Sequence, residues 1–153
     1  MTWDAYHRRD KVMRDVIAVA DARGDGTLPI EVPGVAGAFG DELALIGALQ
    51  MRWHTKLTGM IERELMDQPM DPEGAVLSAW RRTANELSGV RAILDNYSDV
   101  HTSPDIDRAI STARRKDWAL MAAMAGLSNG QTRRAAVVGR KLEQQARAVQ
   151  LAA

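Results

Sequence analysis

Apolar residues recur at helical spacing along almost the whole chain, and the alternating pattern of half-buried strands is nearly absent. The clearest pattern spans residues 71–97, where seven side chains follow one another at alternating steps of three and four residues. They are Val76, Trp80, Thr83, Leu87, Val90, Leu94 and Tyr97. This spacing is typical of one helix that packs along its length against antiparallel neighbours. The pattern predicts an all-α protein.

The positions of glycine, proline and capping residues divide the chain into five predicted helices. We expect them to span about residues 2–23, 41–66, 71–97, 103–125 and 128–149. Asp71 and Ser103 each stand directly before a proline, which is the order that favours a helix start. The longest irregular segment is expected at residues 24–40, with a short helical turn within residues 32–39. Short connections predict that consecutive helices run antiparallel, as in an up-and-down bundle.

The length and composition set limits on domain number and location. A chain of 153 residues with 46% apolar and 26% charged residues is typical of one globular domain, here residues 1–153. Charged residues follow closely on the N-terminus, where a signal peptide needs an apolar run, and no run is long enough for a membrane helix. We therefore expect a cytoplasmic protein that does not enter a membrane.

The formal net charge is zero, but the charges are unevenly distributed along the chain. Residues 1–107 carry 11 basic and 18 acidic side chains, whereas residues 108–153 carry 9 basic and 2 acidic ones. Apart from Arg108, the basic side chains of the last two predicted helices are Arg114, Arg115, Lys116, Arg133, Arg134, Arg140, Lys141 and Arg147. They suit phosphate contacts, so nucleic-acid binding is one hypothesis. The competing interpretation, which we favour, is a solvated face neutralised within the fold, because charge alone does not read sequence.

A few polar residues interrupt the apolar faces, and helical geometry predicts which of them share a level. Facing residues of an antiparallel helix pair have numbers with a constant sum, which places His54 and Asp117 near the level of residue 84, beside Glu86. The first helix would add Tyr6, His7 and Asp10 to this layer. The chain has no cysteine, so a metal site here would use His7, Asp10, His54, Glu86 and Asp117, a ligand set that suits iron, manganese or zinc.

Other interpretations of these residues remain open. The layer could instead hold a small polar ligand, with Tyr6 among its contacts and Trp53 and Trp118 as walls. The register of the last two helices also places Asp117 beside Arg140, so a structural ion pair would explain the buried acid without a ligand, and we favour this interpretation. We expect the four tryptophans to anchor the core, with an interface role as the alternative.

The familiar motifs of catalysis and phosphate binding are missing from the sequence. The leading hypothesis is therefore a non-enzymatic helical interaction module. We expect it to bind a second copy of itself or a helical partner through an apolar or tryptophan-bearing face, and its eight methionines suit adaptable contacts. The second hypothesis is a metal- or small-ligand-binding bundle, and the third is nucleic-acid binding through the basic C-terminal helices.

Overall fold

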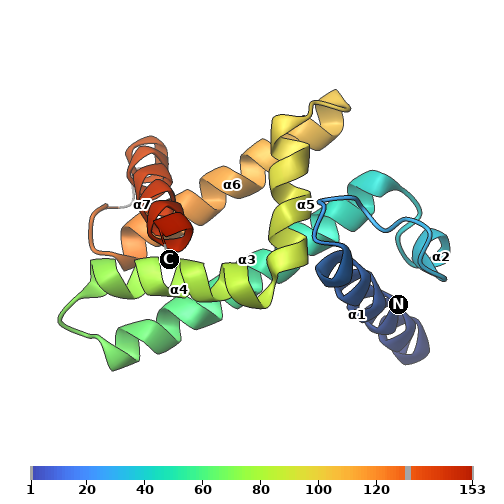
Figure 1. The fold of residues 1–153 in the computed structure, drawn as a ribbon, viewed down its shortest axis with the longest axis horizontal. Coiled ribbons are helices and arrows are strands. Elements are labelled where there is room, and N and C mark those ends of the chain that lie inside the picture. The colour runs from blue at the N-terminus through green and yellow to red at the C-terminus, as the bar shows by residue number, and fades with distance from the viewer. Residues whose placement is uncertain (1, 130–131, 153) are drawn as a thin grey trace. The chain divides into compact units, whose positions relative to one another are not determined.

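A computed structural model describes residues 2–129 and 132–152, and within these residues it contains helices and connecting segments but no strand. The all-α prediction is therefore confirmed. Seven helices follow one another along this part of the chain (Figure 1). They are α1 (Trp3–Arg23), α2 (Val35–Phe39), α3 (Glu42–Asp67), α4 (Pro72–Glu86), α5 (Ser88–Asp99), α6 (Pro104–Met124) and α7 (Thr132–Ala152).

Three helix starts occur where the sequence predicts them. The side-chain oxygens of Thr2, Asp71 and Ser103 each accept a hydrogen bond from the backbone N–H three residues further on, at 3.2, 3.0 and 3.1 Å. Each bond satisfies a backbone donor that has no partner within its helix. Local chemistry alone therefore fixes where α1, α4 and α6 begin.

The prediction of one continuous helix over residues 71–97 is wrong, because the segment forms α4 and α5 with a break at Leu87. Leu87 has φ −117° and ψ 46°, which lies outside the helical range. The break places the amide of Gly89 2.8 Å from a carboxylate oxygen of Asp21 on α1, which accepts its hydrogen bond. The apolar spacing continues across the break, so the sequence pattern does not reveal it. This break and α2 account for the difference between the five predicted helices and the seven observed ones.

The chain divides into two compact units. Unit 1 comprises Met1–Met51 and Leu87–Ile110, and unit 2 comprises Arg52–Glu86 and Ser111–Ala153. Each unit therefore combines two segments that are distant in the sequence. The single domain expected from the chain length stays a prediction.

In unit 1, α1 packs against α5 and α2. A Cβ added to Gly89 would lie 2.4 Å from the backbone of Ala20 and Asp21, so α1 and α5 approach each other closely at this glycine. The side chains that α1 buries are Val12, Met13, Val16 and Ala20. The N-terminal turns of α1 therefore contribute no side chain to the core. The core role predicted for Trp3 is therefore wrong, because its side chain is 75% exposed.

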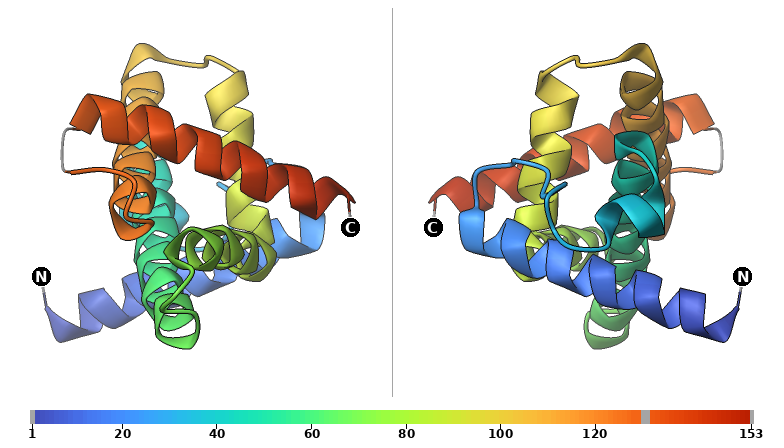
Figure 2. Two further views of the ribbon diagram at one scale, coloured as in Figure 1. Left: turned by 90° about the vertical axis from the view of Figure 1, so that its left-hand side faces the viewer. Right: turned by 90° about the vertical axis from the view of Figure 1, so that its right-hand side faces the viewer.

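Unit 2 is built around two buried tryptophans. Trp53 on α3 and Trp80 on α4 make an edge-to-face contact with ring centroids 5.8 Å apart. Helix α7 packs against α4, and both helices can be followed in the left-hand view of Figure 2. A Cβ added to Gly139 of α7 would lie 1.9 Å from the carbonyl oxygen of Trp118, which shows that α6 and α7 touch through their backbones. The core role predicted for Trp53 and Trp80 is confirmed.

None of the helices in the described residues is long and apolar enough to cross a membrane.

Candidate functional sites

Two of the predicted polar residues, His54 on α3 and Asp117 on α6, meet in unit 2. The Nδ1 atom of His54 lies 2.7 Å from Oδ1 of Asp117. Asp117 is only 6% exposed, whereas the His54 side chain is 41% exposed. The hydrogen bond that the imidazole donates to Asp117 raises the pKa of His54. Partial burial lowers this pKa, the negative charge of Asp117 raises it further, and the nearby charge of Lys116 lowers it. Asp117 therefore fixes the orientation of the imidazole and favours its protonated form.

The Nε2 atom of His54 has no hydrogen-bond partner among the described residues. A histidine whose Nδ1 is held by a carboxylate can use Nε2 to bind a ligand or to exchange a proton. The backbone carbonyl of His54 accepts a hydrogen bond of 2.8 Å from the Thr58 hydroxyl, which further orders this turn of α3. The chemistry available at this pair is therefore that of one oriented, half-exposed imidazole.

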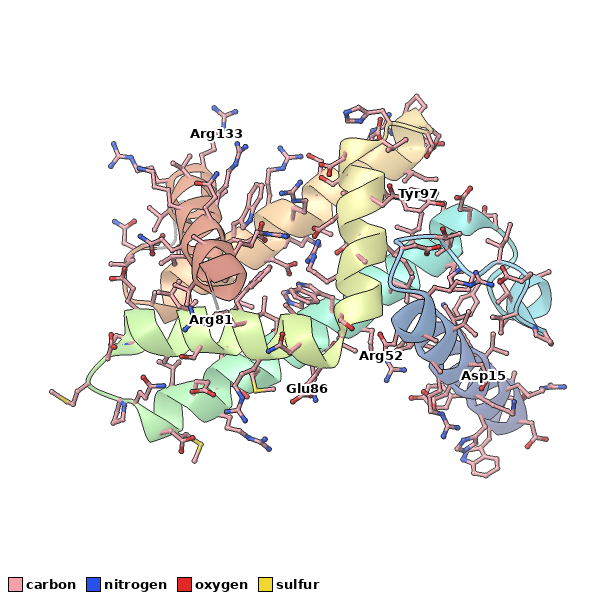
Figure 3. All side chains as sticks on the ribbon, viewed as in Figure 1. Asp15, Arg52, Arg81, Glu86, Tyr97 and Arg133 are labelled. Atoms are coloured by element: carbon pink, nitrogen blue, oxygen red, sulfur yellow. The ribbon has the colours of Figure 1, made fainter. Side chains whose placement is uncertain are left out.

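The remaining predicted metal ligands have other neighbours. Glu86, labelled in Figure 3, lies in unit 2 and forms an ion pair of 2.6 Å with Lys56. Among the residues that the structure describes, no three His, Asp or Glu side chains come together in a group that could hold a metal ion. The structure thus joins two of the five predicted ligands, and an iron, manganese or zinc site stays a prediction.

Tyr6, His7 and Asp10 lie on α1 and belong to unit 1. His7 makes edge-to-face contacts with Trp3 and Tyr6, with ring centroids 3.9 and 5.9 Å away. Asp10 forms an exposed ion pair of 3.4 Å with Arg14. Trp3 is 75% exposed and Tyr6 62% exposed. We call Trp3, Tyr6 and His7 the aromatic cluster of α1.

The predicted ligand walls, Trp53 and Trp118, differ in exposure. Trp53 is fully buried, so it cannot line an open site. Trp118 is half-buried, and its Nε1 donates a hydrogen bond of 3.3 Å to the buried Glu143 of α7. Arg114 and Arg140 lie over its ring, 4.9 and 5.8 Å from the centroid. Trp118 therefore joins α6 to α7, and its role as a ligand wall stays a prediction.

The two acids within residues 108–153, Asp117 and Glu143, are both buried. Glu143 pairs with Arg147 at 3.2 Å and Arg114 at 3.8 Å, while Arg140 stacks on Trp118. The other five predicted basic residues are exposed, and Figure 3 shows Arg133 on the outer side of α7. These five are Arg115, Lys116, Arg133, Arg134 and Lys141. The described surface of α7 is therefore free of acids.

Two structural features were missed in the sequence. Glu143 was not singled out, although it is an acid on a helix face that otherwise buries Ala135, Leu142 and Ala146. A hollow of about 360 Å³ on α3 was missed as well. In the sequence, Gly59 stands among long basic residues at helical spacing, and such a glycine predicts a hollow on the helix surface. Hydrophobic periodicity does not detect this pattern.

Comparisons of this chain with protein-family models, curated proteins and solved structures find no match.

Proposed function

We propose that this protein is a non-enzymatic helical interaction module that pairs with a second copy of itself through the aromatic cluster of α1. The observation that carries the proposal is the exposure of Trp3 and Tyr6 on turns of α1 that bury no side chain of their own. Tryptophan and tyrosine are the residues that most often dominate binding energy at interfaces. Burying both rings against a partner would release their apolar surface from water.

The charges around the cluster support a second copy as the partner. Residues 4–15 of α1 carry three acids and four bases in an alternating order: Asp4, Asp10 and Asp15 with Arg8, Arg9, Lys11 and Arg14. In a two-fold symmetric antiparallel pair the numbers of facing residues have a constant sum, and one such register places Asp4 opposite Arg14 and Asp10 opposite Arg8 of the other copy. A formal net charge of zero also means that two copies do not repel each other strongly.

The proposal extends to the finer arrangement of the chain and its surroundings. We further propose that consecutive helices pack antiparallel in an up-and-down arrangement and that the protein is cytoplasmic. Its partner would be a second copy of the chain or another helical protein. The confirmed helix starts and the exposed aromatic cluster are consistent with these parts.

The experiment is a measurement of molar mass by size-exclusion chromatography with light scattering at micromolar concentration. We expect twice the single-chain mass of 16.8 kDa. The double substitution Trp3→Ser and Tyr6→Ser should weaken association by at least about 30-fold, which corresponds to the loss of one interface hot spot. The matched control is Met66→Ser with Met70→Ser, which removes two exposed apolar side chains from unit 2. A single-chain mass for the wild-type protein, or equal dissociation of both variants, would contradict the proposal.

A second candidate function is the binding of a metal or small polar ligand by Nε2 of His54. It is favoured by the hydrogen bond that orients the imidazole from the buried side while the ring stays partly exposed. The test is elemental analysis of protein purified without a histidine tag, for the wild type and for His54→Ala. Binding predicts iron, manganese or zinc near one equivalent, lost in the variant. Less than about a tenth of an equivalent in the wild type would rule out the metal version.

A further inference from the structure

Helix α7 has a buried face and an exposed face that run along most of its length. The buried face follows the row Ala135, Gly139, Leu142 and Ala146. A second row repeats the same steps of four, three and four residues but begins two positions earlier, which places it on the opposite side of the helix. Its four residues are exposed, and so are three that directly follow members of the row. We call these seven residues the outer face of α7: Arg133, Arg134, Val137, Arg140, Lys141, Gln144 and Gln145.

The acids in this part of unit 2 do not neutralise the outer face. Glu143 is the only acid in the sequence of α7, and it is buried, paired with Arg147 at 3.2 Å and Arg114 at 3.8 Å. Asp117 of α6 is buried as well and is bonded to His54. Neutralisation by these two acids therefore involves side chains that do not belong to the outer face.

Three basic side chains of the outer face form no ion pair with any residue that the structure describes. They are Arg133, Arg134 and Lys141. The guanidinium of Arg140 lies over the ring of Trp118, 5.8 Å from its centroid, so that contact sets its position. At least three positive charges therefore remain without an opposite charge on one side of one helix. Such a concentration of charge favours a negatively charged partner.

The other residues of the outer face decide between negatively charged partners. A helix that lies on a membrane presents large apolar side chains, but the outer face has only Val137, and Leu142 is buried. Proteins that bind single strands stack the bases on aromatic rings, and the sequence of α7 contains none. Double-stranded DNA requires neither feature. Arginine, lysine and glutamine are the residues that contact guanine and adenine in its major groove, and apolar side chains contact the thymine methyl group.

We infer that the outer face of α7 binds the major groove of double-stranded DNA. An α-helix with its side chains is about 10–12 Å across and the groove is about 12 Å wide, so the two fit. Arg134 and Lys141 stand about 10 Å apart along the helix axis and would contact phosphates, as would Arg133. Gln144 and Gln145 lie one turn further on, where their amide groups can donate to and accept from adenine. The major groove of double-stranded RNA is too narrow for a helix.

The test is fluorescence anisotropy of a labelled DNA duplex of about 20 base pairs and mixed sequence, titrated with the full chain between about 50 and 200 mM salt. We expect a Kd of about 10 μM or tighter at about 50 mM salt. Each phosphate contact contributes about −0.9 to the slope of log K against log salt concentration, so three contacts predict a slope of about −3. Unlabelled single strand of the same sequence and poly-glutamate serve as competitors. Sedimentation with vesicles of phosphatidylserine and phosphatidylcholine tests a membrane.

Two variants locate the contact on α7. Arg134→Gln and Lys141→Gln each remove one positive charge of the outer face. Each should weaken binding about tenfold at about 50 mM salt and make the slope less steep by about one. Arg63→Gln is the matched control, because it removes an exposed positive charge of unit 2 from α3, and its affinity and slope should stay close to those of the wild type. All three side chains are exposed, so the variants are expected to fold.

Four results would overturn the inference. They are no change of anisotropy at about 100 μM protein and about 50 mM salt, equal weakening by Arg63→Gln and Lys141→Gln, competition by the single strand or poly-glutamate as strong as that by unlabelled duplex, or binding to vesicles alone. The second would indicate a diffuse charge effect, the third an attraction to any polyanion and the last a membrane surface.

Discussion

The two units of this protein use the same kind of helix contact but place their aromatic and charged residues differently. Each unit has a crossing of two helices at a glycine, Gly89 in unit 1 and Gly139 in unit 2. Unit 1 contains 7 basic and 12 acidic residues, whereas unit 2 contains 13 basic and 8 acidic ones, so their net charges are −5 and +5. The same kind of close backbone contact therefore occurs in two units of opposite net charge.

The aromatic residues separate the units further. Unit 2 buries Trp53 and Trp80 and half-buries Trp118, whereas unit 1 exposes Trp3. Buried rings stabilise a core, and an exposed ring stabilises nothing until a partner covers it. The same residue type thus serves packing in one unit and, in our proposal, association in the other. It also provides a tool, because tryptophan fluorescence in a Trp3→Phe background reports on unit 2 alone.

The largest effect is expected from Gly139→Ala. The new Cβ would lie 1.9 Å from the carbonyl oxygen of Trp118, so α6 and α7 must move apart. Such overpacking should lower the free energy of unfolding of unit 2 by about 3 kcal/mol. Urea denaturation followed by tryptophan fluorescence measures it. Gly59→Ala is the control, and we expect it to raise stability by about 1 kcal/mol because its Cβ meets open space. Equal midpoints for these two variants would contradict the close contact of α6 with α7.

Replacing Glu143 by leucine should destabilise unit 2 by about 2 kcal/mol. The change removes the buried carboxylate that accepts hydrogen bonds from Trp118 and Arg147 and pairs with Arg114. Removing one partner of a buried ion pair leaves the other charges uncompensated, although partial exposure of both arginines reduces the cost. The same urea titration applies. Glu62→Gln alters an exposed acid of unit 2 and should change stability by less than about 0.5 kcal/mol. A similar small change in Glu143→Leu would show that the cluster adds little.

In unit 1, Asp21→Ala should lower stability by about 1 kcal/mol. Asp21 acts as a cap for α5 from another helix, because its carboxylate accepts the hydrogen bond of the Gly89 amide. Circular dichroism during urea denaturation measures the loss. Asp15→Ala is the control, since Asp15 only forms an exposed ion pair with Lys11 and should contribute about 0.5 kcal/mol or less.

The same variant tests whether the two units unfold separately. If they do, Asp21→Ala shifts the circular dichroism transition but leaves the tryptophan fluorescence transition of the Trp3→Phe background unchanged. We expect both transitions to shift together, as the prediction of a single domain requires. A shift confined to circular dichroism would contradict that prediction.

The smallest effect is a pH dependence of the His54–Asp117 pair. Because the folded-state pKa of His54 is raised, the pair contributes its full stability below the ordinary pKa of histidine, near 6.5. The contribution is lost as the pH rises through the raised pKa. The stability difference between wild type and His54→Gln should therefore shrink from pH 5.5 towards pH 8.5, and urea titrations at both values measure it. Solvent screening keeps the effect small, because the side chain is 41% exposed. A difference that grows with pH would contradict the assigned protonation.

His7→Gln serves as the control for the pH experiment. The described contacts of His7 are with the rings of Trp3 and Tyr6 and not with an acid. This control separates an effect of the Asp117 pair from a general effect of removing a histidine.

Much of the secondary structure could be predicted from the sequence, because its causes are local. The caps Thr2, Asp71 and Ser103 act within one helical turn, and the apolar spacing over residues 41–66 is produced within α3. The sequence singled out His54 and Asp117 together, but the register that placed them at one level assumed a continuous helix through residue 97, and that helix breaks at Leu87. The level of Tyr6, His7 and Asp10 could not be predicted from residue numbers. The long segment between α1 and α3 leaves the register of these two helices undefined.

The all-α character, most helix boundaries and the uneven charge could be read from the amino-acid order, since each depends on neighbouring residues. The break at Leu87, the exposure of Trp3 and the burial of Glu143 could not be inferred in this way. These features depend on which segments meet: Asp21 lies 68 positions from Gly89, and Glu143 lies 25 positions from Trp118. Periodicity shows which face of a helix is apolar, but only contacts between helices determine how much of that face is covered.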